Sequence, residues 1–179
     1  GQKHIAITDH GSMSGIPQMY QAAREADISF TPGCEMYFAT DQTLKAPDKI
    51  GEKYYHLIML AYNNEGYTNL SKLQTIAWNE GYYYKPRIDY SALEKHHKGL
   101  TVTTSCLGGI VNQYLLRDDI ASAEAELAKF VDIFGKENTY VELQNHGIDE
   151  QLKILGAQRD LARRFGLKMI ATTDSHYCT

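Results

Sequence analysis

The sequence has 179 residues, of which 43% are hydrophobic and 22% are charged, and its formal net charge is −4. This composition is that of an ordinary globular domain, and no apolar run reaches the roughly 20 residues of a membrane-spanning helix. A duplex-binding domain usually shows a basic footprint, and this chain has none overall, although a metal nuclease stays possible because bound ions partly neutralise its carboxylates. Three cysteines without framework spacing favour a reducing, cytoplasmic setting.

Short apolar runs with the length of β-strands alternate along the chain with segments that have the apolar spacing of an amphipathic helix. The polar segment 41–51, which contains Pro47, is predicted to be a surface loop. In chain order, we predict a strand at 5–8, a helix at 16–23, strands at 36–39 and 57–61, a weaker helix at 70–77, a strand at 100–104, a helix at 127–134, a strand at 140–143, a helix at 154–165 and a strand at 169–172.

This alternation predicts an α/β fold, with a parallel sheet covered by helices and residues 1–179 in a single domain. Polar residues follow several different strands, which favours a TIM-like barrel with a site at one rim. An open, doubly wound sheet is the alternative. Neither of the glycine-rich phosphate-binding motifs, G-x-G-x-x-G and G-x-x-x-x-G-K-[ST], supports that alternative, because neither occurs in the sequence.

The first candidate metal ligands follow the strand at 5–8. Asp9 and His10 stand directly before Gly11, at the point where the chain leaves the predicted sheet. Imidazole and carboxylate groups at strand ends are typical metal ligands, and we expect His10 to bind a metal. Asp9 has two interpretations, a ligand or the cap of the following helix.

Three further candidates lie near the middle of the chain. Glu35 precedes an apolar segment, where a carboxylate is costly unless it is paired or metal-bound, whereas its neighbour Cys34 is expected to face the core. His56 begins an apolar run and is either a ligand or a buried histidine with satisfied hydrogen bonds. Cys106 follows the strand at 100–104, and its residue type alone favours a small buried apolar group over a soft ligand.

The end of the chain repeats the arrangement of its start. Asp174 and His176 follow the strand at 169–172, and on an extended chain two residues that are two apart share a face. This spacing favours a chelating pair. His146 follows the strand at 140–143 and is a candidate to support a ligand or to contact a substrate.

The segment 81–87 contains three consecutive tyrosines beside two basic residues. Tyr83, Lys85 and Arg87 could stack on bases and neutralise phosphates of a nucleic acid. With about equal weight, the tyrosines could pack over the edge of the sheet.

The sequence contains no G-x-S-x-G nucleophile motif and no H-E-x-x-H zinc motif. The candidate ligands are instead spread over the chain. Such dispersal is typical of a multi-metal site that binds and cleaves phosphoesters.

As a set, these segments resemble the polymerase-and-histidinol-phosphatase (PHP) domain family, and more narrowly the form of that domain in bacterial replicative polymerases of the DNA polymerase III alpha-subunit type. The similarity covers nearly the whole chain, and the segments at 79–89 and 99–109 favour the polymerase form over the small phosphatases. The matching segments are ITDHGSMSG (7–15), TPGCEMY (31–37), HLIMLAYN (56–63), NEGYYYKPRID (79–89), GLTVTTSCLGG (99–109), ELQNHG (142–147) and ATTDSHY (171–177).

The resemblance implies a distorted, seven-stranded TIM-like barrel with a trinuclear centre of Zn, Mn or Fe at one rim. It implies metal-ligand roles for His10, Glu35, His56, Cys106, Asp174 and His176. Catalytic roles are expected for His10, Asp174 and His176, and supporting or substrate-binding roles for Asp9, His146, Tyr83, Lys85 and Arg87.

One part of the family pattern is missing. The family's first strand supplies a His-x-His and, shortly afterwards, an Asp, and no His-x-His occurs in this sequence. We therefore expect an N-terminally truncated PHP domain that lacks the first strand. By itself it should bind metal poorly and catalyse little.

The resemblance further implies a part of a replicative DNA polymerase whose complete PHP domain acts as a metal-dependent 3′→5′ proofreading exonuclease. The implied partners are the primer 3′ end, the Mg²⁺-dependent polymerase domains of the same chain, and replisome subunits such as the sliding clamp. Two alternatives stay open: a non-catalytic module that stabilises the polymerase, and a free-standing phosphoesterase for small phosphomonoesters.

Overall fold

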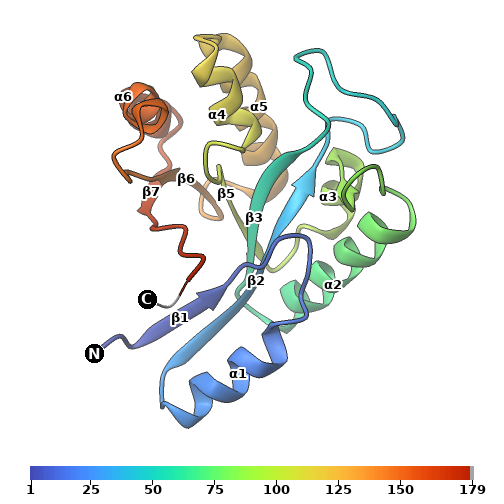
Figure 1. Cartoon of the computed structure of the whole chain (residues 1–179), viewed down its shortest axis with the longest axis vertical. Coiled ribbons are helices and arrows are strands. Elements are labelled where there is room, and N and C mark those ends of the chain that lie inside the picture. Colours follow the sequence, from blue (N-terminus) through green and yellow to red (C-terminus); the bar gives the residue numbers. More distant parts are fainter. Residues whose placement is uncertain (178–179) are drawn as a thin grey trace. The chain divides into compact units, whose positions relative to one another are not determined.

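A computed structural model describes residues 1–177 and confirms the mixed α/β class. Its elements divide into two compact units, Gly1–Thr101 and Val102–Thr179 (Figure 1). The prediction of one domain over residues 1–179 stays a prediction. No helix within the described part of the chain is both long and apolar enough to cross a bilayer.

The first unit is built around one long strand. β2 (Ser29–Phe38) pairs in parallel with β1 (His4–Ile7) and with β4 (Arg87–Ile88), and antiparallel with β3 (Tyr55–Ala61). Its helices are α1 (Ile16–Glu25), α2 (Asn64–Asn79) and α3 (Tyr90–His96). The two-residue strand β4 and the short helix α3 were not predicted, because neither is long enough to show a period.

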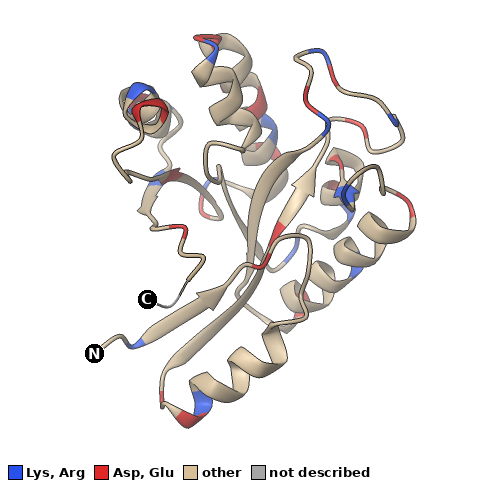
Figure 2. Cartoon of the chain, in the orientation of Figure 1, with Lys and Arg blue, Asp and Glu red and all other residues tan. Residues whose placement is uncertain are grey.

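The antiparallel pairing of β2 with β3 corrects the prediction of a parallel sheet for these two strands. The predicted loop at 41–51 is present, and it connects β2 to β3 without the crossover helix that parallel pairing requires. Both signs of charge occur in this loop (Figure 2). Asp48 organises it by accepting hydrogen bonds from the N–H groups of Ile50 and Glu52 and from the Tyr55 hydroxyl.

The two faces of β2 and β3 have different surroundings. Cys34 of β2 lies 3.7 Å from Gln74 of α2 (Sγ to Oε1), so the face of β2 that carries Cys34 lies against the helices. Side chains alternate across a strand, and Glu35 and Tyr37 therefore belong to the opposite face. His56 is the register partner of Tyr37 and shares that face. The strand pairing thus brings candidate ligands together from residues that are far apart in the sequence.

Helix α2 extends well beyond the weakly periodic segment 70–77. It begins after Asn63, whose Oδ1 accepts the N–H of Gly66 at 2.8 Å, a side-chain cap that satisfies one of the free donors of the first turn. Asp89 caps α3 in the same way through the N–H of Ala92 at 3.1 Å. Local capping therefore sets where these helices begin.

The second unit shows the strand–helix alternation that the sequence predicts. β5 (Leu100–Thr103), whose last two residues open this unit, pairs in parallel with β6 (Thr139–Leu143), and β6 pairs in parallel with β7 (Lys168–Ala171). Helix α6 ends at Gly166, whose φ of +66° favours glycine. The helices are α4 (Ile110–Leu116), α5 (Ile120–Phe134) and α6 (Asp149–Phe165).

Candidate metal centre

Backbone hydrogen bonds beyond the end of β1 hold His10 beside Glu35. The carbonyl of Asp9 accepts the Glu35 N–H at 3.1 Å, and the Gly11 N–H donates to the Glu35 carbonyl at 2.8 Å. Gly11 has a φ of +57°, and a Cβ at this position would lie 2.7 Å from the Tyr37 ring. Glycine therefore permits a turn that a larger residue would strain, and this turn fixes the position of His10.

The side chains of His10, Glu35 and His56 converge on one face of β2 and β3. Glu35 Oε2 lies 3.1 Å from His10 Nδ1, and Glu35 Oε1 lies 2.5 Å from His56 Nδ1. The three ligand atoms all lie within 4.8 Å of one another. Glu35 is 3% exposed, whereas the side chains of His10 and His56 are 41% and 25% exposed. The group is therefore buried at the carboxylate and accessible at the imidazoles.

This donor set fits a divalent metal ion. Two imidazole nitrogens and a carboxylate suit Zn²⁺, Mn²⁺ or Fe²⁺. Two donors at about 2.1 Å from one tetrahedral ion stand roughly 3.4 Å apart, which is comparable with the 3.1 Å between Glu35 and His10. The shorter contact between Glu35 and His56 is that of a hydrogen bond, and it must open slightly to admit an ion.

Two tyrosines that the sequence interpretation missed line this group. The Tyr37 and His10 rings are stacked, with centroids 6.4 Å apart, and the Tyr54 and His56 rings are nearly parallel at 6.3 Å. Tyr37 and Tyr54 also meet edge to face at 5.0 Å. Alternation along the chain could have found both, because Tyr37 follows Glu35 by two residues and Tyr54 precedes His56 by two.

Asp9 lies next to the group without joining it. A Cβ on Gly15 would lie 2.5 Å from Asp9 Oδ2, so the Asp9 carboxylate packs over Gly15 at the start of α1. The N-cap of α1 is Gly15 and not Asp9. The capping interpretation of Asp9 is therefore wrong, and its ligand role stays a prediction.

Arg87 has a structural role that corrects its predicted contact with substrate. The side chain is 1% exposed, although it was expected to neutralise a phosphate. Burial leaves the guanidinium no surface for a substrate, and it lowers the Arg87 pKa. The guanidinium donates to four backbone carbonyls at 2.9–3.1 Å, those of Gln42, Leu44, Lys53 and Gly81.

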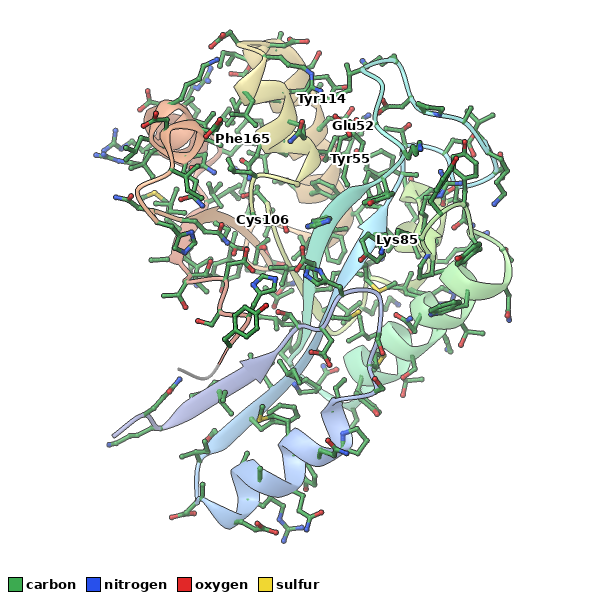
Figure 3. The ribbon with its side chains drawn as sticks, viewed as in Figure 1. Glu52, Tyr55, Lys85, Cys106, Tyr114 and Phe165 are labelled. Atoms are coloured by element: carbon green, nitrogen blue, oxygen red, sulfur yellow. The ribbon has the colours of Figure 1, made fainter. Side chains whose placement is uncertain are left out.

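Tyr83 and Lys85, the other two candidates in this segment, are half-buried. The Tyr83 ring lies 5.0 Å from the Arg87 guanidinium, which favours the packing interpretation for this tyrosine. The Lys85 ammonium (labelled in Figure 3) lies 5.2 Å from the centre of the Tyr37 ring. Lys85 is therefore adjacent to the aromatic side of the His10–Glu35–His56 group.

The other predicted ligands belong to the second unit. Cys106 is partly exposed and lies in the loop after β5 (Figure 3). Asp174 and His176 follow β7, and Asp174 Oδ1 lies 3.9 Å from His176 Nδ1. One ion can contact both, because atoms at about 2.1 Å from a metal are at most about 4.2 Å apart. Within residues 102–177 these side chains do not converge as a group of three, so His10, Glu35 and His56 are the predicted ligands that the structure brings together.

His146 has the geometry of a supporting residue. Gln151 Oε1 accepts the His146 backbone N–H at 2.8 Å, so its amide nitrogen is the group that faces His146 Nδ1 at 3.0 Å. Nδ1 is then an acceptor, and the protonated Nε2 donates to the Thr173 carbonyl at 2.9 Å. Both ring nitrogens are in use, and the bond to Thr173 holds the segment directly before Asp174.

Cys34 packs in the core, as its position beside Glu35 predicted, and this has a consequence for alkaline stability. Its side chain is fully buried, and burial raises the thiol pKa from 9.0 to about 12. Folding therefore favours the thiol, and this stabilisation is complete below pH 9 and is lost as the pH rises from 9 towards 12. Between pH 9 and 10, the unfolding free energy should fall by about 1 kcal/mol more in the native sequence than in Cys34→Ala.

Urea unfolding of residues 1–179, followed by the fluorescence of the single tryptophan, Trp78, measures this difference. Met59→Leu, a core change without a thiol, serves as the control and should keep the slope of the native sequence. Parallel pH profiles for the native sequence and Cys34→Ala would contradict the prediction.

Comparison with known proteins decides the family. The model of the PHP domain family matches residues 1–146. The chain belongs to the PHP domain family. Together with the strand–helix alternation, this confirms the predicted α/β fold of the TIM-like PHP type.

This PHP domain is similar to one part of a much longer bacterial protein. It is 42% identical over 175 residues to the DNA polymerase III subunit alpha of Borreliella burgdorferi, a match that covers 97% of the chain and 15% of that relative. The subunits of the same name from Treponema pallidum and Aquifex aeolicus are 39% and 40% identical, with 99% of the chain and 15% and 16% of each relative covered. The chain thus spans about 15% of the length of these relatives.

Proposed function

We propose that this PHP domain is part of the alpha subunit of a bacterial replicative DNA polymerase in the cytoplasm. In its complete form the domain hydrolyses phosphodiesters at the 3′ end of a primer as a metal-dependent exonuclease. The similarity to polymerase subunits over 97% of the chain supports the first statement. The convergence of His10, Glu35 and His56 is the observation that carries the second.

The proposed reaction adds one water across the terminal phosphodiester. The bond between phosphorus and the 3′ oxygen breaks, and the products are a nucleoside 5′-monophosphate and a strand with a new 3′-hydroxyl. A divalent metal bound at the site supplies the positive charge that activates the water and holds the leaving oxygen. The buried Glu35 carboxylate holds both histidine Nδ1 atoms towards one point, and the accessible imidazoles leave that point open to a substrate.

Neighbouring side chains fit the binding of a strand end. The Tyr37 and Tyr54 rings flank the ligand group, and aromatic rings of this kind orient bases by stacking. Lys85 places a cation beside Tyr37, where it can pair with a phosphate. In this proposal Cys106, Asp174 and His176 of the second unit are further metal ligands. The proposed partners are the polymerase domains of the same chain and the sliding clamp.

The test is removal of a mismatched 3′ nucleotide by the full-length protein. We expect the native protein, with Mn²⁺ or Zn²⁺, to shorten a mismatched primer, and Asp174→Ala/His176→Ala to be at least about 100-fold slower. Loss of an outer partner of a ligand already costs 10–100-fold in metal affinity or activity, and loss of two ligands should cost more. Gel analysis of labelled primers gives both rates.

The polymerase assay on the same samples separates the exonuclease from a purely structural module. Lower replication fidelity with normal thermal stability supports hydrolysis. Lower polymerase stability with unchanged fidelity supports the structural module. A native protein that leaves the mismatched end intact with both metals would contradict the exonuclease proposal, and turnover of small phosphomonoesters would favour the phosphoesterase alternative.

A further inference from the structure

A buried carboxylate in the second unit has no part in the proposed reaction. Glu142, near the end of β6, is 1% exposed. Its Oε2 accepts the Thr103 hydroxyl and its Oε1 accepts the Thr172 hydroxyl, each at 2.5 Å, and Oε1 also accepts the Gln144 amide at 3.1 Å. These donors are neutral, so no cation among them offsets the cost of burying the carboxylate. Replacing such a buried charged group by an apolar residue of similar size often leaves the stability of the fold unchanged. The hydrogen bonds of Glu142 therefore suggest a role other than stabilising the fold.

One branch of these hydrogen bonds reaches the loop that presents Cys106. Thr103 is the last residue of β5, and its hydroxyl oxygen, besides donating to Glu142, accepts the Ser105 N–H at 3.1 Å. Ser105 is 1% exposed and has a φ of +62°, which is uncommon for a residue other than glycine. Such a conformation persists only where its surroundings over-determine it. The strained residue directly precedes Cys106, so the position of the thiol depends on these contacts.

Helix α4 fixes the same loop from a second direction. The Asn112 side-chain amide donates to the carbonyls of residues 104, 105 and 106 at 3.3, 3.0 and 2.8 Å. The Gln158 amide of α6 donates to Asn112 Oδ1 at 3.0 Å and to the Glu142 backbone carbonyl at 3.2 Å. Asn112 and Gln158 are 1% and 5% exposed. The loop that contains Cys106 is therefore linked by hydrogen bonds both to the side chain of Glu142, through Thr103, and to the backbone carbonyl of Glu142, through Gln158 and Asn112.

A second branch reaches the segment that presents Asp174 and His176. Thr172 is the first residue after β7, and its hydroxyl donates to Glu142 and accepts the Gln144 amide at 3.2 Å. Asp174 follows two residues later with a φ of +45°, so it too has a left-handed backbone. Glu142 thus binds the last residue of β5 with one carboxylate oxygen and the first residue after β7 with the other.

We propose that Glu142 is a positioning residue, which sets the mutual geometry of Cys106 and the Asp174/His176 pair through Thr103 and Thr172. This inference rests on the proposed function, in which those three residues are metal ligands. Glutamine has the same size but only one acceptor oxygen, so it cannot accept both hydroxyls in the observed arrangement. Glu142→Gln should therefore loosen the spacing of the ligands and weaken metal binding by about 10–100-fold, the usual effect of losing a partner of the ligands.

The experiment measures how Zn²⁺ protects Cys106 from alkylation in the full-length protein. Iodoacetamide labelling of the Cys106 peptide is quantified by mass spectrometry over a series of Zn²⁺ concentrations, which gives a half-protective concentration without an activity assay. We expect Glu142→Gln to raise this concentration by about 10–100-fold. Glu126→Gln is the matched control, because Glu126 is also a buried carboxylate (5% exposed) but pairs with Lys129 on α5. It should leave the half-protective concentration unchanged.

Thr172→Val is a milder second variant that keeps the shape of the side chain and removes one hydroxyl donor. It should shift the half-protective concentration in the same direction as Glu142→Gln, and it keeps the inference testable if Glu142→Gln does not fold. A lower thermal unfolding temperature with unchanged Zn²⁺ protection in the folded variants would overturn the positioning role. If Zn²⁺ does not protect Cys106 in the native protein, the ligand role of Cys106 in the proposed function fails first, and this inference fails with it.

Discussion

Glu35→Gln is expected to weaken metal binding at the His10–Glu35–His56 group by at least about 100-fold. The change keeps the shape of the side chain but removes the negative charge and one of the two oxygens that face the histidine Nδ1 atoms at 3.1 and 2.5 Å. Loss of an outer partner of a ligand costs 10–100-fold, and loss of a ligand should cost at least the upper end of that range. Metal titration and elemental analysis of the full-length protein measure this change.

Fold stability should not fall in Glu35→Gln, because the variant removes a buried charge rather than creating one. Glu126→Gln, the same chemical change at a buried carboxylate outside the site, should bind metal like the native protein. If Glu35→Gln retains the full metal content and affinity, the ion is held elsewhere and the assignment of Glu35 as a ligand is wrong.

Arg87→Met is expected to destabilise the first unit by about 3 kcal/mol or more. The native guanidinium donates to four backbone carbonyls, and methionine leaves those carbonyls without their donor in a site that is 1% exposed to water. A buried acceptor that loses its partner costs about 1–3 kcal/mol, and several losses at one site exceed the effect of one. Urea unfolding of residues 1–179, followed by Trp78 fluorescence, reports the change in unfolding free energy.

Lys85→Met, two residues earlier in the same segment, is the matched control. Lys85 is half-buried with its ammonium near the Tyr37 ring, and its loss should cost about 0.5 kcal/mol. The same pair of variants separates structure from substrate binding, because Lys85→Met should weaken binding of a primer end while the fold stays intact. Equal unfolding midpoints for the two variants would show that Arg87 does not hold the segment together.

The candidate site illustrates what local sequence reasoning can reach. The sequence indicates His10 and Glu35 because an imidazole at a strand end is a typical metal ligand, and because a carboxylate in an apolar segment is costly unless it is paired or metal-bound. Tyr37 and Tyr54 were missed, although alternation from Glu35 and His56 places them on the same face. Arg87 was misassigned, since a sequence cannot distinguish a cation that binds phosphate from one that donates its hydrogen bonds to backbone carbonyls of a distant loop.

For the fold, too, local features were predicted correctly, whereas the pairing of distant segments was not. The predicted strands and helices are present, because their apolar periods and caps lie within short stretches of chain. The prediction of a parallel sheet was wrong at β2 and β3, since alternation of elements does not state which strands pair or in which direction. Pairing depends on contacts between distant residues, and the loop between these strands lacks the helix that the parallel arrangement requires.

The sequence by itself determined the α/β class, the segments that carry the candidate ligands and the kind of chemistry that those residue types favour, because composition, period and residue type are local properties. Only the tertiary structure decided that His10, Glu35 and His56 meet, that Arg87 is internal, and that Glu142 links the end of β5 to the residue directly after β7. These relations are set by strand register and by buried hydrogen bonds between residues far apart in the chain. Such contacts leave no recognisable pattern in the local sequence around either of the two residues that make them.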